Sequence, residues 1–139
     1  MIKGILPCLG GLMLAGTVSA QDLPLGDTDA GRMIAGQFRT CHGLDGYAKI
    51  PIAPHIGGEP ATYLIEQLVA FRDGTREHEM MTVVARNLTD QNIADVAAWY
   101  ASHQAIATLS PDIADAPDAC IGCHGADGIA VIDGVPNLA

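Results

Sequence analysis

Two stretches of this chain are similar enough in sequence to form an internal repeat. Residues 41–57 (CHGLDGYAKIPIAPHIG) align without a gap with residues 123–139 (CHGADGIAVIDGVPNLA), and eight of the 17 positions are identical. A chain with such a repeat is built from similar structural units. We therefore predict one whole unit over residues 21–104, a linker over 105–117 and the beginning of a second unit over 118–139. Because the second copy covers only the opening of a unit, we expect the sequence to be a fragment or its reading frame to end early.

The segment 1–20 is expected to direct export and not to join the fold. Lys3 supplies the positive charge, the segment 5–18 forms an apolar run, and Val18-Ser19-Ala20 has the small side chains of a cleavage site. The predicted location is the periplasm, with cleavage after Ala20. A retained membrane anchor is the alternative, although the run is shorter than the ~20 residues of a membrane-spanning helix. No later segment is apolar enough for a span, so we expect no stable membrane span after cleavage.

The first unit is predicted to be all-α. One helix is expected over Ala30–Thr40, a second from Pro60 to about Gly74, and a third after the N-cap residue Thr89. Apolar residues recur at helical spacing and predict the buried faces, namely Leu64, Leu68 and Phe71 in the second helix and Ile93, Val96, Ala97 and Tyr100 in the third. So small a unit has little core of its own, and a large bound cofactor would supply its apolar centre.

The motif Cys120-Ile-Gly-Cys123-His124 predicts covalently bound haem. In such a motif two thiols add to the haem vinyl groups, and the adjacent histidine supplies a nitrogen ligand to the iron. A zinc site would need a second pair of ligands, and a thioredoxin-like redox site would need a βαβ context. The sequence offers neither. Cys120 and Cys123 are therefore expected to hold a haem c, with His124 as iron ligand, if a full-length second unit exists.

The first copy of the motif has lost one thiol. In the alignment of the two copies, Phe38 stands at the position of Cys120, while Cys41 and His42 match Cys123 and His124. One account is that Cys41 alone attaches the haem and Phe38 packs against it. The other is that Phe38 reflects a single-base change in the determined sequence. Since iron binding needs His42 and a sixth ligand and not the missing thiol, we expect haem at this site under either account.

Other residues are candidates for completing the iron site. The adjacent Met80 and Met81 are expected in a loop between the second and third helices, and a thioether is a suitable sixth ligand for a haem that only transfers electrons. Pro54 follows His42 at the same spacing at which Pro136 follows His124. A carbonyl at this repeated spacing is a candidate acceptor for the second ring nitrogen of each histidine. His78, close to Met81, is an alternative ligand.

These motifs together resemble the class I c-type cytochromes, and most closely the dihaem cytochrome c4-like group. The matching runs are GRMIAGQFRTCHGLDG, APHIGG, ATYLIEQLVAFRDGTREHEMM, NLTDQNIADVAAWYAS, CIGCHGADG and VPNLA. The resemblance implies a cytochrome c-like helical fold around haem c, with His42 and His124 as proximal ligands and Pro54 and Pro136 as their carbonyl partners. It also implies Met81 rather than Met80 as the sixth ligand, because of its spacing ahead of Leu88. Phe38 departs from the family pattern, and the Met-bearing part of the second unit would fall beyond Ala139.

The resemblance implies a periplasmic carrier of single electrons, not an enzyme, between a dehydrogenase or quinol-oxidising complex and a terminal acceptor. The alternative is a cytochrome subunit of a periplasmic dehydrogenase complex that oxidises sulfur compounds or alcohols. The chain has 16 acidic and 7 basic residues, so nucleic acid is not an expected partner. An acidic surface suits docking to a basic face of a redox protein, although the same charge also serves solubility.

Overall fold

The computed structural model describes residues 23–106 and 117–138. The regular elements in these two segments are all helices: α1 (Thr28–Ala35), α2 (Arg39–His42), α3 (Ala61–Asp73), α4 (Met81–Ala85), α5 (Asp90–Ala101) and α6 (Asp118–His124). The prediction of an all-α chain is therefore confirmed. The proposed signal peptide, most of the predicted linker and Ala139 lie outside the described residues, and the domain boundaries stay predictions.

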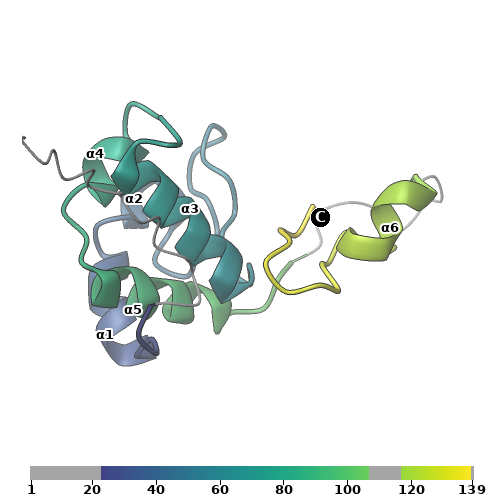
Figure 1. Cartoon of the computed structure of the whole chain (residues 1–139), viewed down its shortest axis with the longest axis horizontal. Coiled ribbons are helices and arrows are strands. Elements are labelled where there is room, and N and C mark those ends of the chain that lie inside the picture. Colours follow the sequence, from purple (N-terminus) through teal and green to yellow (C-terminus); the bar gives the residue numbers. More distant parts are fainter. Residues whose placement is uncertain (1–22, 107–116, 139) are drawn as a thin grey trace, which may run out of the picture.

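Helices α1 and α5 form the closest helix pair of the first unit (Figure 1). A Cβ atom on Gly31 of α1 would collide with the backbone oxygen of Asp95 in α5, so this approach requires glycine. On α5 the predicted apolar face is buried as expected. The helix begins after Thr89, whose hydroxyl accepts from the backbone N–H of Asn92, and the Asn92 side chain accepts in return from Thr89 N–H.

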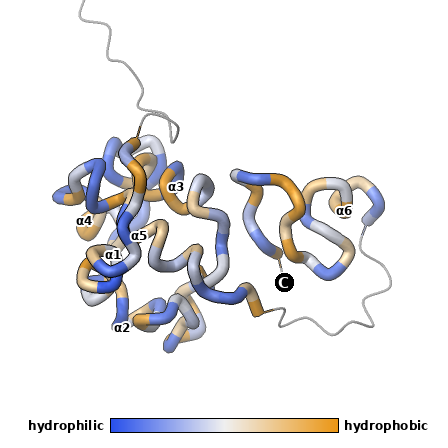
Figure 2. Tube along the Cα trace, turned by 90° about the horizontal axis from the view of Figure 1, so that it is seen from below, coloured by the Kyte–Doolittle hydropathy of each residue, from blue (hydrophilic) through white to orange (hydrophobic). Residues whose placement is uncertain are grey.

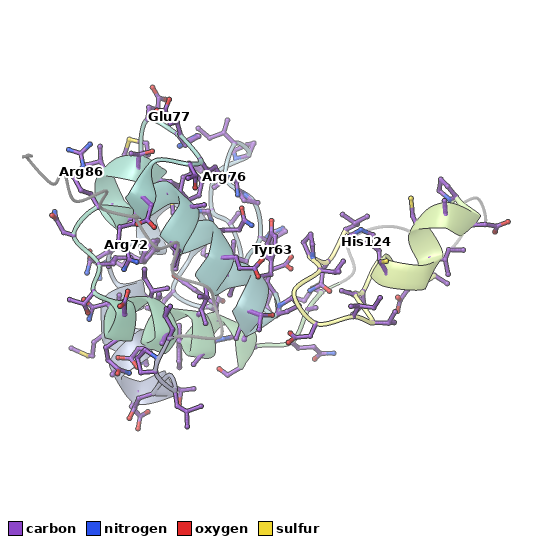
Figure 3. All side chains as sticks on the ribbon, in the orientation of Figure 1. Tyr63, Arg72, Arg76, Glu77, Arg86 and His124 are labelled. Carbon is purple, nitrogen blue, oxygen red and sulfur yellow. The ribbon has the colours of Figure 1, made fainter. Side chains whose placement is uncertain are left out.

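Helix α3 lies across the same core and follows the predicted range closely. Its predicted apolar residues are buried, Pro60 is the N-cap residue instead of the first helical residue, and Gly74 ends the helix in the left-handed region with φ 78°. Arg72 lies near the end of α3 (Figure 3). Its guanidinium donates to the Asp90 carboxylate at 2.7 Å and so ties α3 to the beginning of α5.

The predicted helix over Ala30–Thr40 is wrong as one continuous element. Helix α1 ends at Ala35, the N–H groups of residues 36–38 bond three residues back instead of four, and α2 begins at Arg39. Gly36, a weak helix former, stands at this tightened turn. The change of direction places Phe38 in the core, where only 5% of its surface is exposed.

Residues 117–138 form a smaller lobe beside the first unit (Figure 1). Helix α6 contains no fully buried residue, in contrast to α3 and α5. Polar and apolar positions are interleaved along the tube of both lobes (Figure 2). None of the helices in the described part of the chain combines the length and the hydropathy needed to span a bilayer.

Candidate functional site

His42 has a buried imidazole ring. Its Nδ1 is hydrogen-bonded, and its Nε2 forms no hydrogen bond to a described residue. His42 ends α2, is 7% exposed, and its Nδ1 lies 2.9 Å from the carbonyl oxygen of Pro54. A carbonyl oxygen only accepts, so Nδ1 carries the proton and Nε2 keeps its lone pair. No buried side-chain nitrogen or oxygen among the described residues lacks a partner. The Nε2 lone pair makes no hydrogen bond to a described residue and is available to an iron.

The second lobe contains the same pair. His124 ends α6, and its Nδ1 lies 2.8 Å from the carbonyl oxygen of Pro136. The structure thus brings each of the two histidines together with the proline that the repeated spacing indicated. In each pair the proline carbonyl sets the tautomer and the orientation of the ring.

The first loop (residues 43–57) and the second loop (residues 125–138) follow the two histidines. Equivalent residues in and just before the two loops form the same backbone hydrogen bonds. Lys49 N–H donates to Cys41 O at 2.8 Å, and Val131 N–H donates to Cys123 O at 3.0 Å. The glycine after each histidine has nearly the same positive φ, 75° at Gly43 and 73° at Gly125. The repeat in the sequence is therefore a repeated loop fold.

One repeated contact involves residues that differ between the loops. The backbone N–H of Ala48 donates to His55 Nδ1 at 2.9 Å, and that of Ala130 donates to Asn137 Oδ1 at 2.8 Å. His55 and Asn137 occupy equivalent positions of the repeat and supply the same acceptor. Sequence reasoning missed this role, because only the shared ability to accept a hydrogen bond connects the two residue types.

The thiols stand next to the two histidines. Cys41 is partly exposed, Cys120 and Cys123 are exposed, and none of the three forms a disulfide among the described residues. Phe38, at the position equivalent to Cys120, is buried with its ring at 6.4 Å edge-to-face from the ring of Tyr100. The first loop thus presents one thiol and an aromatic ring where the second presents two thiols.

Two aromatic residues of α5 hold the first loop. Trp99 Nε1–H donates to the carbonyl oxygen of Leu44 at 2.7 Å, and the Tyr100 hydroxyl donates to that of Gly43 at 3.4 Å. Burial raises the pKa of the Tyr100 hydroxyl, and the charge of Asp45 raises it further. The phenol therefore stays protonated and donates. The sequence did not predict these two hydrogen bonds to the residues that follow His42.

The predicted sixth ligand lies on a short helix and not in a loop. Met81 is the first residue of α4, it is partly buried, and it packs against the core, whereas Met80 is 58% exposed. His78, the alternative ligand, directs Nδ1 toward the backbone N–H groups of Met80 and Met81 at 3.3 and 3.4 Å. Of these residues, Met81 is the thioether that lies against the core.

The second lobe contacts the first through the end of its loop. Asn137 donates through its backbone N–H to Glu59 Oε2 at 2.9 Å and through Nδ2 to Gly58 O at 3.0 Å. Thr62 donates to the Asp133 carboxylate at 2.6 Å. A cavity of about 340 Å³ lies at this junction, and Tyr47, His55, Glu59 and Asn137 are among the residues that line it. Burial raises the pKa of the Glu59 carboxyl, and the bond from Asn137 opposes part of that effect.

The side chains present fit haem c. Each loop offers an imidazole with a free Nε2 and a neighbouring free thiol, and the first unit adds a core-facing thioether. Across residues 23–106 and 117–138, no group of three or more His, Cys, Asp and Glu side chains is arranged to hold a metal ion directly. A porphyrin brings four ligands of its own, so one imidazole and one thioether complete the iron site.

No model of a protein family matches this chain. Cytochrome c4 of Pseudomonas aeruginosa is 34% identical over 128 residues, which cover 81% of this chain and 64% of that protein. The chain thus spans less than two thirds of the length of this relative. Cytochrome c-554(548) of Halomonas halodenitrificans is 43% identical over 82 residues, which cover 57% of this chain and 99% of that protein. A protein of Thiomonas intermedia named thiosulfate dehydrogenase electron acceptor is 28% identical over 117 residues, with coverage of 70% and 54%.

The fold agrees with these relatives. The crystal structure of reduced recombinant cytochrome c4 from Pseudomonas stutzeri superposes with a TM-score of 0.70 at 28% identity, covering 82% of this chain and 73% of that one. The predicted cytochrome c-like helical fold is confirmed. The chain belongs to the cytochrome c4-like group of class I c-type cytochromes, proteins that carry haem c.

Proposed function

We propose that this protein is a periplasmic carrier of single electrons. The observation that carries the proposal is the duplicated pair of a histidine Nδ1 and a proline carbonyl, His42 with Pro54 and His124 with Pro136. Each pair leaves Nε2 free to ligate iron in a fixed orientation. When bound, the haem supplies an iron that gains and loses one electron.

In the first unit, His42 and Met81 are the residues that would hold the haem iron. The Pro54 carbonyl keeps the His42 proton on Nδ1 and makes Nε2 a better donor to iron. Met81, packed against the core, would supply a thioether as the second protein ligand of the iron. A His/Met pair leaves no coordination site for a substrate, so we propose electron transfer through the cofactor edge and not catalysis at the iron.

Covalent attachment in the first unit rests on Cys41. Its free thiol would hold the haem by addition of S–H across one vinyl C=C bond, sulfur to one carbon and hydrogen to the other, with no oxidant required. Phe38 offers no thiol, and one vinyl group is therefore expected to stay intact. At the second motif, Cys120 and Cys123 are the proposed attachment points and His124 the proposed iron ligand.

The proposed route of electrons is from a dehydrogenase or quinol-oxidising complex to a terminal acceptor. The net charge of −9 suits encounter with a basic face of a redox protein. The second candidate is the cytochrome subunit of a periplasmic dehydrogenase complex for sulfur compounds or alcohols. The similarity to a thiosulfate dehydrogenase electron acceptor favours the sulfur branch of this candidate.

The test is the ligation and reactivity of the haem protein matured in a periplasm. If the protein is an electron carrier, its ferric form should show the long-wavelength charge-transfer band typical of thioether-ligated haem. It should also bind azide or carbon monoxide slowly. Met81→Ala should keep the haem but lose that band, whereas Met80→Ala should retain it. Rapid azide binding to the unmodified protein, or a Met81→Ala spectrum that equals the wild-type spectrum, would contradict the ligand assignment.

The two candidate functions can be distinguished by whether the protein is stably bound to a partner. An isolated carrier remains a single species on size-exclusion chromatography and accepts electrons in diffusional encounters whose rate falls as ionic strength rises. A dehydrogenase subunit instead co-purifies with a larger chain from its native host. Retention of such a complex through high-salt washing would favour the second candidate.

A further inference from the structure

His78 and Thr82 form a reciprocal clasp around the residue proposed as the sixth ligand. The backbone N–H of His78 donates to Thr82 Oγ1 at 3.0 Å, and the backbone N–H of Thr82 donates to the carbonyl oxygen of His78 at 3.0 Å. His78 Nδ1 accepts from the N–H groups of Met80 and Met81. These contacts close the chain from residue 78 to residue 82 into one turn.

The clasp supplies partners that helix α4 cannot supply itself. The first N–H groups of a helix have no acceptor inside the helix, and α4 has only five residues. Among the described residues, His78 provides the side-chain acceptor for two of these groups. An isolated helix of this length is not stable in water, so its position depends on such contacts and on packing.

The position of α4 determines which methionine faces the core. Met81 packs against the core cluster, whereas its neighbour Met80 is exposed. Successive residues of a helix point about 100° apart, so a shift of one residue would exchange the two thioethers. The bonds from Met80 and Met81 to His78 oppose such a shift.

We propose that His78 is a positioning residue that holds Met81 in place as the sixth ligand. The inference rests on the proposed His42 and Met81 ligation of the first haem. His78 acts through the acceptor lone pair of Nδ1, which is directed at backbone N–H groups and is thereby withdrawn from binding iron itself. Thr82 completes the clasp from the other end through its hydroxyl.

The matched substitutions are His78→Ala and His78→Asn. Alanine removes the acceptor, while the Asn side-chain oxygen can accept from a backbone N–H two residues ahead. Thr82→Val removes the hydroxyl at nearly constant shape. Glu79→Gln is the control, since Glu79 is exposed and makes none of the hydrogen bonds of the clasp.

The measurement is the rate at which cyanide binds to the ferric protein, because cyanide enters when the thioether leaves. Loss of a helix cap predicts about a five- to tenfold faster rate for His78→Ala and Thr82→Val. His78→Asn and Glu79→Gln should stay within about twofold of wild type, and every variant should keep its Soret band and its far-ultraviolet circular dichroism at the working temperature. This pattern would show that the substitutions increase the mobility of Met81 without unfolding the protein.

Three results would overturn the inference, and they differ in what else they affect. If His78→Ala binds cyanide at the wild-type rate while Met81→Ala binds it fast, Met81 is the ligand but His78 does not position it. If the wild-type protein lacks the thioether band and Met81→Ala changes nothing, the ligand assignment itself fails and the positioning role fails with it. Equal acceleration by His78→Asn and His78→Ala would also reject the acceptor role.

Discussion

The carbonyl oxygen of Pro54 lies 2.9 Å from Nδ1 of His42, and the chain repeats this relationship between Pro136 and His124 at 2.8 Å. The two loops share little beyond eight identities, yet they close with the same main-chain hydrogen bonds. Such duplication is expected when each loop must present one imidazole nitrogen in a fixed orientation. The loop, more than any single helix, is the unit that the sequence repeats.

His55→Ala should destabilise the first loop, and His55→Asn should not. Alanine leaves the N–H of Ala48 without the Nδ1 acceptor, at a cost of about 0.5–1.5 kcal/mol. Asparagine already performs this task at the equivalent position 137. Denaturant unfolding of the haem protein would measure the difference. Equal unfolding free energies for the two variants would show that the hydrogen bond does not matter.

Phe38→Cys should restore a second attachment in the first unit. The new thiol would stand where Cys120 stands in the second motif, and saturation of the remaining vinyl group would shift the α-band of the pyridine haemochrome to shorter wavelength. Phe38→Ala is the control, which should leave the band unshifted. Because Phe38 is buried against Tyr100, both variants should lose stability, by about 3–5 kcal/mol for alanine. An unshifted band in Phe38→Cys would show that position 38 does not face a vinyl group.

Glu59 should make the contact between the lobes dependent on pH. Burial raises the pKa of its carboxyl in the folded state, so the folded protein binds more protons than the unfolded chain between the unfolded pKa of 4.5 and the raised folded value. The contribution of Glu59 to the free energy of unfolding should therefore be largest below pH 4.5 and fall as pH rises through this window. Glu59→Gln should remove this part of the pH dependence, whereas Glu66→Gln, at an exposed position of α3, should retain it. Thermal unfolding at several pH values would test the difference between the two variants.

Gly31→Ala should weaken the packing of α1 on α5. The added Cβ would collide with the backbone oxygen of Asp95, which cannot rotate away as a flexible side chain could. The expected cost is about 1–3 kcal/mol. A Gly31→Ala protein with wild-type thermal stability would mean that the helices can separate without cost.

The sequence predicted features that depend on local signals. Thr89 caps the beginning of α5, Gly74 ends α3, and the apolar face of α5 is buried because spacing and capping act within one helix. The break between α1 and α2 was not predicted, because a single Gly36 in a helical pattern does not reveal a change of direction. Tertiary packing of Phe38 decides that geometry, and no local signal records it.

Contacts between distant residues were the least predictable part of the site. The bond from Trp99 to Leu44 O and the bonds from Asn137 to Gly58 and Glu59 join segments far apart in the chain. The placement of Met81 at the beginning of α4 also depends on His78, a residue for which the sequence suggested only an alternative ligand role. Motif spacing identified the chemical groups, whereas the positions of those groups depend on contacts that spacing does not encode.

The most direct test of the account is mass spectrometry of tryptic peptides from the protein matured in a periplasm, together with a denaturing gel stained for haem. We expect haem bound through one thioether to the peptide that contains Cys41 and, where a full-length second unit exists, haem bound through two thioethers to the peptide that contains Cys120 and Cys123. A folded, colourless protein with all three thiols unmodified would contradict it.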